Sequence, residues 1–227
     1  MKLSDTTLMI LKNFATINPG LVFKPGNRIR TISSNKAILA DAAVDENFPR
    51  EFALYDLGKL LDVISLHDNP DLDFHENHIE FKAVGGRAKT RVRYSEPKLI
   101  LSPPNRDLKI PEFDASFVIS EEDFKWVDKV SSILKCPYFT VESDGSYIKV
   151  NAVDVKGEIV DDASLDLTTN AKGNSFKYVI KNENLKLIPG DYQVDIAPNG
   201  IARFTNTTKA NVTYYVAVEK NVSEAAE

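Results

Sequence analysis

The sequence predicts an α+β fold built as two similar domains, and three observations lead to this prediction. Four segments repeat apolar residues at helical spacing, and most of the remaining chain alternates apolar and polar residues between turn dipeptides. A proline-rich stretch divides the 227 residues into halves with the same order of elements, namely a helix, strands, a shorter helix and more strands. Two α+β domains of matching topology are therefore expected.

The helices are expected at about residues 4–17, 54–66, 120–134 and 181–187. Ser4 or Asp5 can cap the first, and the third opens at Ser120 ahead of three acids, which suit the positive end of a helix dipole. Pro189 and Gly190 end the fourth. The apolar stripes of the first three comprise Leu8, Leu11 and Phe14 or Ala15; Leu54, Leu57, Leu60, Leu61 and Ile64; and Phe124, Val127, Val130, Ile133 and Leu134.

Two glycine turns indicate hairpins in the second half. Asp144-Gly145 and Asn199-Gly200 each separate runs rich in β-branched and aromatic residues, as two-residue hairpin turns do. Residues 212–218 mix the same residue types and predict a late strand.

Residues 95–112 are expected to form an extended connector between an N-terminal domain at 1–94 and a C-terminal domain at 113–227. The stretch holds four of the chain's 11 prolines, which lack a backbone donor and are confined to edges and loops. It also carries five apolar residues between Leu99 and Ile110, more than a freely solvated linker normally has. The connector is therefore expected to lie on a surface.

Composition excludes several classes of protein. Acids outnumber bases by 33 to 28, for a net charge of −5, whereas a simple nucleic-acid binder is usually basic, so any DNA contact must come from a local cluster. The lone Cys136 leaves no disulfide framework and no cysteine zinc site, and is expected to be a packing residue. The first residues are not expected to be a signal peptide, and no stretch approaches the ~20 apolar residues of a membrane span.

Five segments together resemble a known family in number, order and spacing. They are LKNFATINPG (11–20), ALYDLGKLLDVISL (53–66), FDASFVISEEDF (113–124), LIPGDYQV (187–194) and YYVAVE (214–219). These segments resemble matching parts of the sliding clamps of T4-type bacteriophages, which belong to the PCNA-like clamp superfamily.

This resemblance implies a DNA polymerase processivity factor that is not an enzyme and needs no cofactor. It implies a head-to-tail homotrimer, a ring with helices around a central hole and antiparallel sheets outside, which encircles double-stranded DNA non-specifically. It also implies loading by an ATP-driven clamp loader, capture of the C-terminal peptide of a DNA polymerase, and location in the cytoplasm of the infected host cell.

Six lysines on the expected helices are candidates to face DNA. Lysine is a flexible, hydrated point charge, so it can attract phosphates without gripping them. The alternative is that they are ordinary solvated residues, because acids interleave with them along the helices. The candidates are Lys12, Lys59, Lys125, Lys129, Lys181 and Lys186.

A strand just before the connector alternates basic residues with packing residues, which places the bases on one face. The alternative is a solvated face that resists edge-to-edge aggregation. The resemblance implies that this strand is an edge at the subunit junction and faces an acidic strand of the neighbouring subunit. The candidates are Arg87, Lys89, Arg91 and Arg93 on the basic side, and Glu158, Asp161, Asp162 and Asp166 on the acidic side.

The resemblance also implies a pocket for an extended apolar peptide, between the connector and the end of the second domain. The alternative is that its residues only pin the connector down, since apolar residues under long loops form small clusters anyway. The matching positions are Leu99, Ile100, Leu101, Ile201, Tyr215 and Val218.

Catalytic and metal functions find little support. Lys89 and Thr90 follow two glycines but lack the spacing of a phosphate loop. His75 and His78 lie near acids without a third ordered ligand, so no metal site is expected. The alternative function from another class is a β-rich, oligomeric structural or assembly protein of a virus particle, which leaves the lysines on the helices unexplained.

Overall fold

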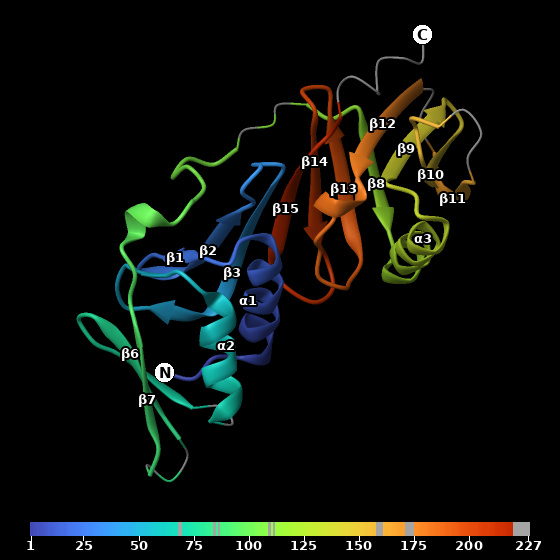
Figure 1. Ribbon diagram of the computed structural model, residues 1–227. Helices are drawn as coiled ribbons and strands as arrows, with labels where there is room; N and C mark the ends of the chain where they lie inside the picture. Colours follow the sequence, from blue (N-terminus) through green and yellow to red (C-terminus); the bar gives the residue numbers. More distant parts are fainter. Residues whose placement is uncertain are drawn as a thin grey trace. The chain divides into compact units, whose positions relative to one another are not determined.

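The structure of the chain, a computed structural model, describes residues 1–67, 70–83, 85, 87–108, 110, 112–157, 161–170 and 175–219 (Figure 1). For residues 168–170 the backbone alone is described. The chain divides into two compact units, and the boundary at Arg106–Asp107 lies inside the predicted connector. Residues 210–212 are grouped with the first unit. Within the described part, no helix is long and apolar enough to cross a membrane.

Among its described residues, the first unit has two α-helices, antiparallel strands and one 3₁₀ turn in the connector. β1 pairs with β4, β2 pairs with β3, and β5, β6 and β7 form a three-stranded sheet in that order. The elements are α1 (Asp5–Ile17), β1 (Leu21–Phe23), β2 (Gly26–Ile32), β3 (Ile38–Phe48), β4 (Phe52–Leu54), α2 (Leu57–Leu66), β5 (Asp71–Phe74), β6 (His78–Lys82), β7 (Lys89–Arg93) and η1 (Pro97–Leu99).

Local signals set the starts of both helices in this unit. The Ser4 hydroxyl accepts a hydrogen bond from the Thr7 amide at 3.2 Å, and the Asp56 carboxylate accepts one from the Lys59 amide at 3.1 Å. α2 is shorter than expected because residues 52–54 pair with β1 instead. α1 and α2 lie side by side (Figure 1) and bury the stripe that contains Phe14.

Asn18, Pro19 and Gly20, here named the NPG clasp, join three segments of the first unit. The Asn18 side-chain amide donates to the carbonyls of Ile32 at 3.0 Å and Leu101 at 3.1 Å, while its oxygen accepts from the Gly20 amide. The Pro19 carbonyl accepts from the Leu57 amide at the start of α2. The expectation that the connector lies on a surface is thus confirmed at its beginning.

Ile100 is the connector residue that packs against the NPG clasp. It is 8% exposed, whereas its neighbours Leu99 and Leu101 are 72% and 42% exposed. A Cβ added to Gly20 would lie 3.0 Å from Ile100 Cδ1 and 3.1 Å from its Cγ2. Gly20 therefore provides the space into which Ile100 packs.

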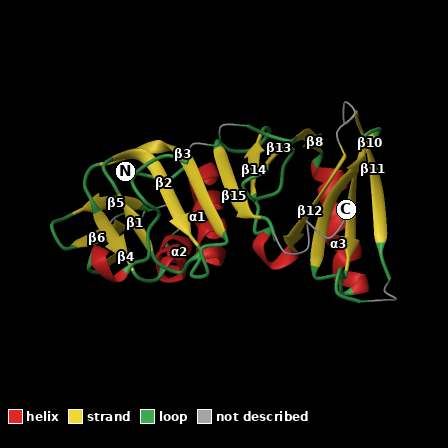
Figure 2. Cartoon of the chain, turned by 90° about the horizontal axis from the view of Figure 1, so that it is seen from above, coloured by secondary structure: helices red, strands yellow, loops and turns green. Residues whose placement is uncertain are grey.

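The second unit has one α-helix among its described residues, a four-stranded sheet β11-β10-β9-β12, and a run of antiparallel strands β8-β13-β14-β15. α3 packs across β10 and β11 (Figure 2). The elements are β8 (Ala115–Ile119), α3 (Glu121–Leu134), β9 (Tyr138–Asp144), β10 (Tyr147–Val153), β11 (Ala163–Asn170), β12 (Ser175–Lys181), η2 (Asn182–Asn184), β13 (Tyr192–Ala197), β14 (Ile201–Asn206) and β15 (Val212–Ala217).

Both predicted hairpins are confirmed. Gly145 and Gly200 lie in the turns between β9 and β10 and between β13 and β14, with φ of +102° and +87°. Glycine reaches this left-handed region without the steric cost of a Cβ. The strand predicted over residues 212–218 corresponds to β15.

The fourth predicted helix is wrong. Lys181 ends β12, and only Asn182–Asn184 form a single 3₁₀ turn. Tertiary bonds override the weak helical pattern: the Asn182 amide donates to the Pro137 carbonyl at 3.0 Å and its side chain to the Cys136 carbonyl at 2.7 Å. The second half therefore lacks the short α-helix expected to match that of the first half.

The apolar stripe predicted for α3 is wrong at Ile133, which is 67% exposed. The helix buries Val127 and Ser131 instead. The Ser131 hydroxyl donates to the Cys136 carbonyl at 2.8 Å, which ties this side of the helix to the chain that follows. Burial, and then the nearby Asp161, raises the pKa of the Cys136 thiol, in keeping with a packing residue.

Candidate DNA-facing, junction and docking surfaces

Four of the six candidate lysines project from α-helices and are exposed. Lys12 lies on α1 and Lys59 on α2 in the first unit, and Lys125 and Lys129 lie on α3 in the second. Lys125 and Lys129 are four residues apart, so they share a face of α3. The sheet-packing side of α3 carries Val127, which leaves this lysine face uncovered within the unit.

The other two candidates are not on an α-helix, which corrects the expectation for them. Lys181 is the last residue of β12, and its ammonium lies 3.4 Å from the Glu219 carboxylate. Lys186 is exposed in the irregular segment after η2.

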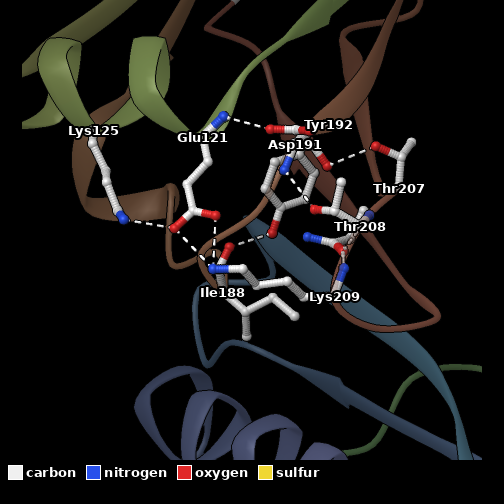
Figure 3. Close-up of polar contacts among 9 residues, drawn as sticks. Glu121, Lys125, Ile188, Asp191, Tyr192, Thr207, Thr208 and Lys209 are labelled. Carbon is white, nitrogen blue, oxygen red and sulfur yellow. Dashed lines mark hydrogen bonds and ion pairs between the residues drawn. The ribbon is translucent and has the colours of Figure 1, made fainter.

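Glu121 holds two lysines at the beginning of α3 (Figure 3). The Lys125 ammonium lies 2.6 Å from one carboxylate oxygen, and the Lys209 ammonium lies 2.7 Å from the other. The hydrogen bond from Lys125, and then that from Lys209, lowers the pKa of Glu121, so this carboxylate is charged at neutral pH. One anion between two cations leaves the cluster with a net positive charge.

Lys209 is a residue that sequence reasoning missed. It lies after β14 in the turn that leads to β15, far along the chain from α3, and a lysine in a turn has no distinguishing pattern. The fold brings it to the helix start through Asp191. The Asp191 carboxylate accepts from the Glu121 amide at 2.8 Å, and its own amide donates to the Thr208 hydroxyl at 3.0 Å (Figure 3).

The predicted basic strand is β7, an edge of the sheet β5-β6-β7. Lys89, Arg91 and Arg93 are exposed and alternate with the half-buried Thr90 and buried Val92, as the alternation predicted. Arg87 is exposed just before the strand.

A buried carboxylate lies among these bases. Glu80, opposite Arg91 on β6, accepts from the Arg91 Nε at 3.0 Å and lies 3.9 Å from the Lys89 ammonium. The hydrogen bond from Arg91 lowers the pKa of Glu80 against the opposing effect of burial. Part of the positive charge of β7 is thus neutralised within the chain itself.

The acidic side of the predicted junction is described in part. Asp161 and Asp162 are exposed before β11, and Asp166 is exposed on β11, an edge of its sheet. Asp166 lies 3.8 Å from the Lys149 ammonium on the neighbouring strand. Glu158 lies outside the described residues.

The six predicted pocket residues divide between the two units. Leu99 and Leu101 are exposed on the connector, whereas Ile100 is buried against the NPG clasp and acts as its anchor. In the second unit, Ile201 and Tyr215 are half-buried on adjacent strands, and Val218 is buried.

The two histidines near the β5–β6 turn gain a third neighbour in the fold. His75, His78 and Glu80 place possible ligand atoms within 4.8 Å of one another, and the two rings stack at 4.6 Å. However, Arg91 and Lys89 already engage the Glu80 carboxylate. A metal ion at this position would be repelled by the positive charges of Arg91 and Lys89, so electrostatics disfavour a cation here.

Comparison with solved structures defines the class of fold. The chain is similar to the A. fulgidus PCNA bound to the C-terminal region of FEN-1 (TM-score 0.71, 15% identity, covering 96% of this chain and 97% of that one). It is also similar to Proliferating Cellular Nuclear Antigen from Entamoeba histolytica (TM-score 0.69, 12% identity, 96% and 97% covered). The fold is that of the PCNA-like clamps.

Sequence comparison then gives the family. The profile described as DNA polymerase processivity factor matches residues 2–86, and that described as gp45 sliding clamp, C terminal, matches residues 116–220. The sliding clamp of Vibrio phage KVP40 is 34% identical over 96% of this chain and 99% of its own length. The sliding clamps of Escherichia phage RB69 and Enterobacteria phage T4 are 29% and 28% identical, each over 96% of this chain and 97% of its own length.

The chain therefore belongs to the sliding clamp family, the processivity factors of phage DNA polymerases. The resemblance stated from the five sequence segments is confirmed. Of the two functions considered from the sequence, the comparisons support the sliding clamp and not the structural protein of a virus particle.

Proposed function

We propose that three copies of this chain close head to tail into a ring around duplex DNA and that exposed helix lysines face the DNA. The observation that carries this proposal is that α1, α2 and α3 each expose lysine in a chain whose net charge is −5. The topology of a ring supplies the tether, so base contacts are unnecessary and a non-specific attraction for phosphate suffices. Lys12, Lys59, Lys125 and Lys129 form the proposed set.

Lys209 joins this set, because it shares the Glu121 carboxylate with Lys125. Lys181 and Lys186 remain weaker members, since neither projects from an α-helix. Pairing with Glu121 reduces the local positive charge without removing it. A modest field of this kind attracts the DNA backbone but does not hold it in place.

The junction is proposed between the β7 edge of one subunit and the β11 edge of the next. Exposed Arg93 and Lys89 on one side, and Asp161, Asp162 and Asp166 on the other, support this through charge complementarity. Exposed ion pairs contribute only about 0–1 kcal/mol each and weaken with salt. Several together orient the subunits yet let a loader open the ring.

The clamp is proposed to have no catalysis of its own and to act in the cytoplasm of an infected host cell. An ATP-driven loader would place it on DNA, and the C-terminal peptide of the polymerase would dock beside the exposed Leu99 and Leu101 of the connector. A bound peptide region occurs in a structural relative, the A. fulgidus PCNA that carries the C-terminal region of FEN-1.

A loading assay on circular DNA tests this function. Wild-type protein, loaded with clamp loader and ATP, should remain on nicked circular DNA through gel filtration in moderate salt and leave when the circle is cut. The variant Arg93→Glu should fail to remain, with a trimer-to-monomer shift in sedimentation, while Lys36→Glu, which changes an exposed turn lysine by the same charge, should behave as wild type. Protein that stays monomeric, or that leaves intact and cut circles alike, contradicts the proposal.

A further inference from the structure

A hollow of about 220 Å³ lies in the first unit between the β1–β2 segment and the connector. Val22, Pro25 and Pro103 give it apolar walls. Three cationic side chains, Lys24, Arg28 and Arg30, also line the hollow, and the polar Ser102 and Asn105 complete the lining. The combination of apolar walls and clustered bases is unlike the general surface of this acidic chain.

One carboxylate partly balances the three cations. Asp41 accepts from the Arg28 Nε at 2.8 Å and lies 3.2 Å from the Arg30 Nε. Three positive charges and one negative charge leave the hollow with a net charge of +2, in a chain whose net charge is −5. An anionic group that enters the hollow is therefore attracted by charges that are already fixed in place.

The connector side of the hollow is held before any ligand arrives. The Arg30 Nη1 donates to the Pro104 carbonyl at 2.8 Å, and the Lys24 ammonium contacts the Asn105 side chain. Upstream, Asn18 bonds the Leu101 carbonyl. A preformed site lowers the ordering cost that the protein must meet on binding.

We propose that this hollow receives acidic side chains of the partner peptide that docks on the connector, so that the preferred peptide is acidic as well as apolar. This inference rests on the peptide docking proposed above. The volume is below the ~300–1,000 Å³ of small-molecule sites and suits one or two side chains. The apolar walls favour a peptide over a nucleic-acid strand, because Val22, Pro25 and Pro103 offer nothing to a phosphate.

Fluorescence anisotropy with two short labelled peptides tests the inference. Both carry the same two phenylalanines; one carries three glutamates and the other three glutamines. The glutamate peptide should bind the wild-type protein more tightly at low salt, and Lys24→Glu should weaken it about fivefold to tenfold while leaving the glutamine peptide unchanged. Lys36→Glu, of equal charge change and outside the hollow, should leave both affinities as in wild type.

Each other outcome has a definite meaning. Equal affinity for both peptides overturns the acidic preference but leaves peptide docking intact. Binding of neither peptide overturns the docking itself, and the inference with it. If Lys24→Glu weakens a short single-stranded oligonucleotide rather than the glutamate peptide, the hollow is a nucleic-acid contact and the inference is wrong. A thermal melt of Lys24→Glu that matches wild type confirms that the exposed substitution has not unfolded the unit.

Discussion

Replacing Gly20 with alanine should loosen the connector without unfolding the protein. Gly20 is not in the left-handed region, so its backbone accepts alanine. The new Cβ would lie 3.0 Å and 3.1 Å from two carbons of Ile100 and 3.3 Å from the Leu54 carbonyl oxygen. Carbon contacts are optimal at ~3.5–4.0 Å, so the Ile100 side chain must move outward.

The expected cost follows from what Ile100 loses. A fully buried isoleucine contributes about 1.5–3 kcal/mol, and partial withdrawal forfeits a share of this. Alanine also lowers the conformational entropy of the unfolded chain, which stabilises the folded state by about 0.4–1 kcal/mol. The net loss should be about 1 kcal/mol and should be confined to the connector, because Ile100 is its anchor.

Hydrogen exchange measures this loss directly. The amides of Leu99 and Ile100 donate to the carbonyls of Glu96 and Pro97, and they should exchange about fivefold faster in Gly20→Ala. Ile100→Ala removes both carbons that the new Cβ meets, so in that background Gly20→Ala should cause no further acceleration. Equal acceleration in both backgrounds would refute the contact on which this reasoning depends.

Three further substitutions test other features. The hydrogen bonds from Lys125 and Lys209 lower the pKa of Glu121 from its ordinary value of 4.5. The stability that the charged Glu121 gives the folded chain is therefore present above pH 4.5 and is lost as the pH falls through the lower folded pKa. The gap in urea midpoint between wild type and Glu121→Gln should therefore close in acid, and a gap that persists there contradicts the assignment. Lys135 caps α3 with φ of +57°, so Lys135→Gly should raise the unfolding free energy by about 0.5–1 kcal/mol in thermal melts, and a loss would show that the lysine side chain is needed. Gly190 has φ of +150° and its added Cβ would overlap the Asn206 side chain, so Gly190→Ala should cost roughly 3 kcal/mol by urea denaturation; an unchanged midpoint would contradict this close packing.

Features coded by adjacent residues were predictable from the sequence. Ser120 caps α3 as expected, with its hydroxyl accepting from the Asp123 amide at 3.1 Å, because a cap depends on residues within one turn. The hairpins at Gly145 and Gly200 depend on two residues each. The alternation along β7 also needs only the period of a strand.

Features that depend on distant contacts were not predictable. The segment after Lys181 has a helical pattern, but bonds from Asn182 to residues near position 137 hold it in a 3₁₀ turn. Lys209 meets Glu121 only through the packing of the β14–β15 turn on α3. Glu80 neutralises β7 from the neighbouring strand, which sequence spacing alone does not reveal.

The candidate site was predicted unevenly for the same reason. Lysines on amphipathic helices can be found by periodicity, which is why Lys12, Lys59, Lys125 and Lys129 emerge exposed. The cationic hollow combines Lys24 and Arg28 with Pro103, far away in the connector. No local pattern joins such residues, and only the folded connector brings them together.

The NPG clasp has a consequence for how this chain tolerates mutation. Its three consecutive residues, Asn18, Pro19 and Gly20, contact three separate segments: the end of β2, the start of α2 and the connector. A substitution at any of them therefore disturbs a contact with a distant part of the chain. A library that samples every substitution should find Asn18 and Gly20 less permissive than the exposed turn residue Lys36. Contacts of this kind constrain the identity of all three residues through packing and hydrogen bonding alone.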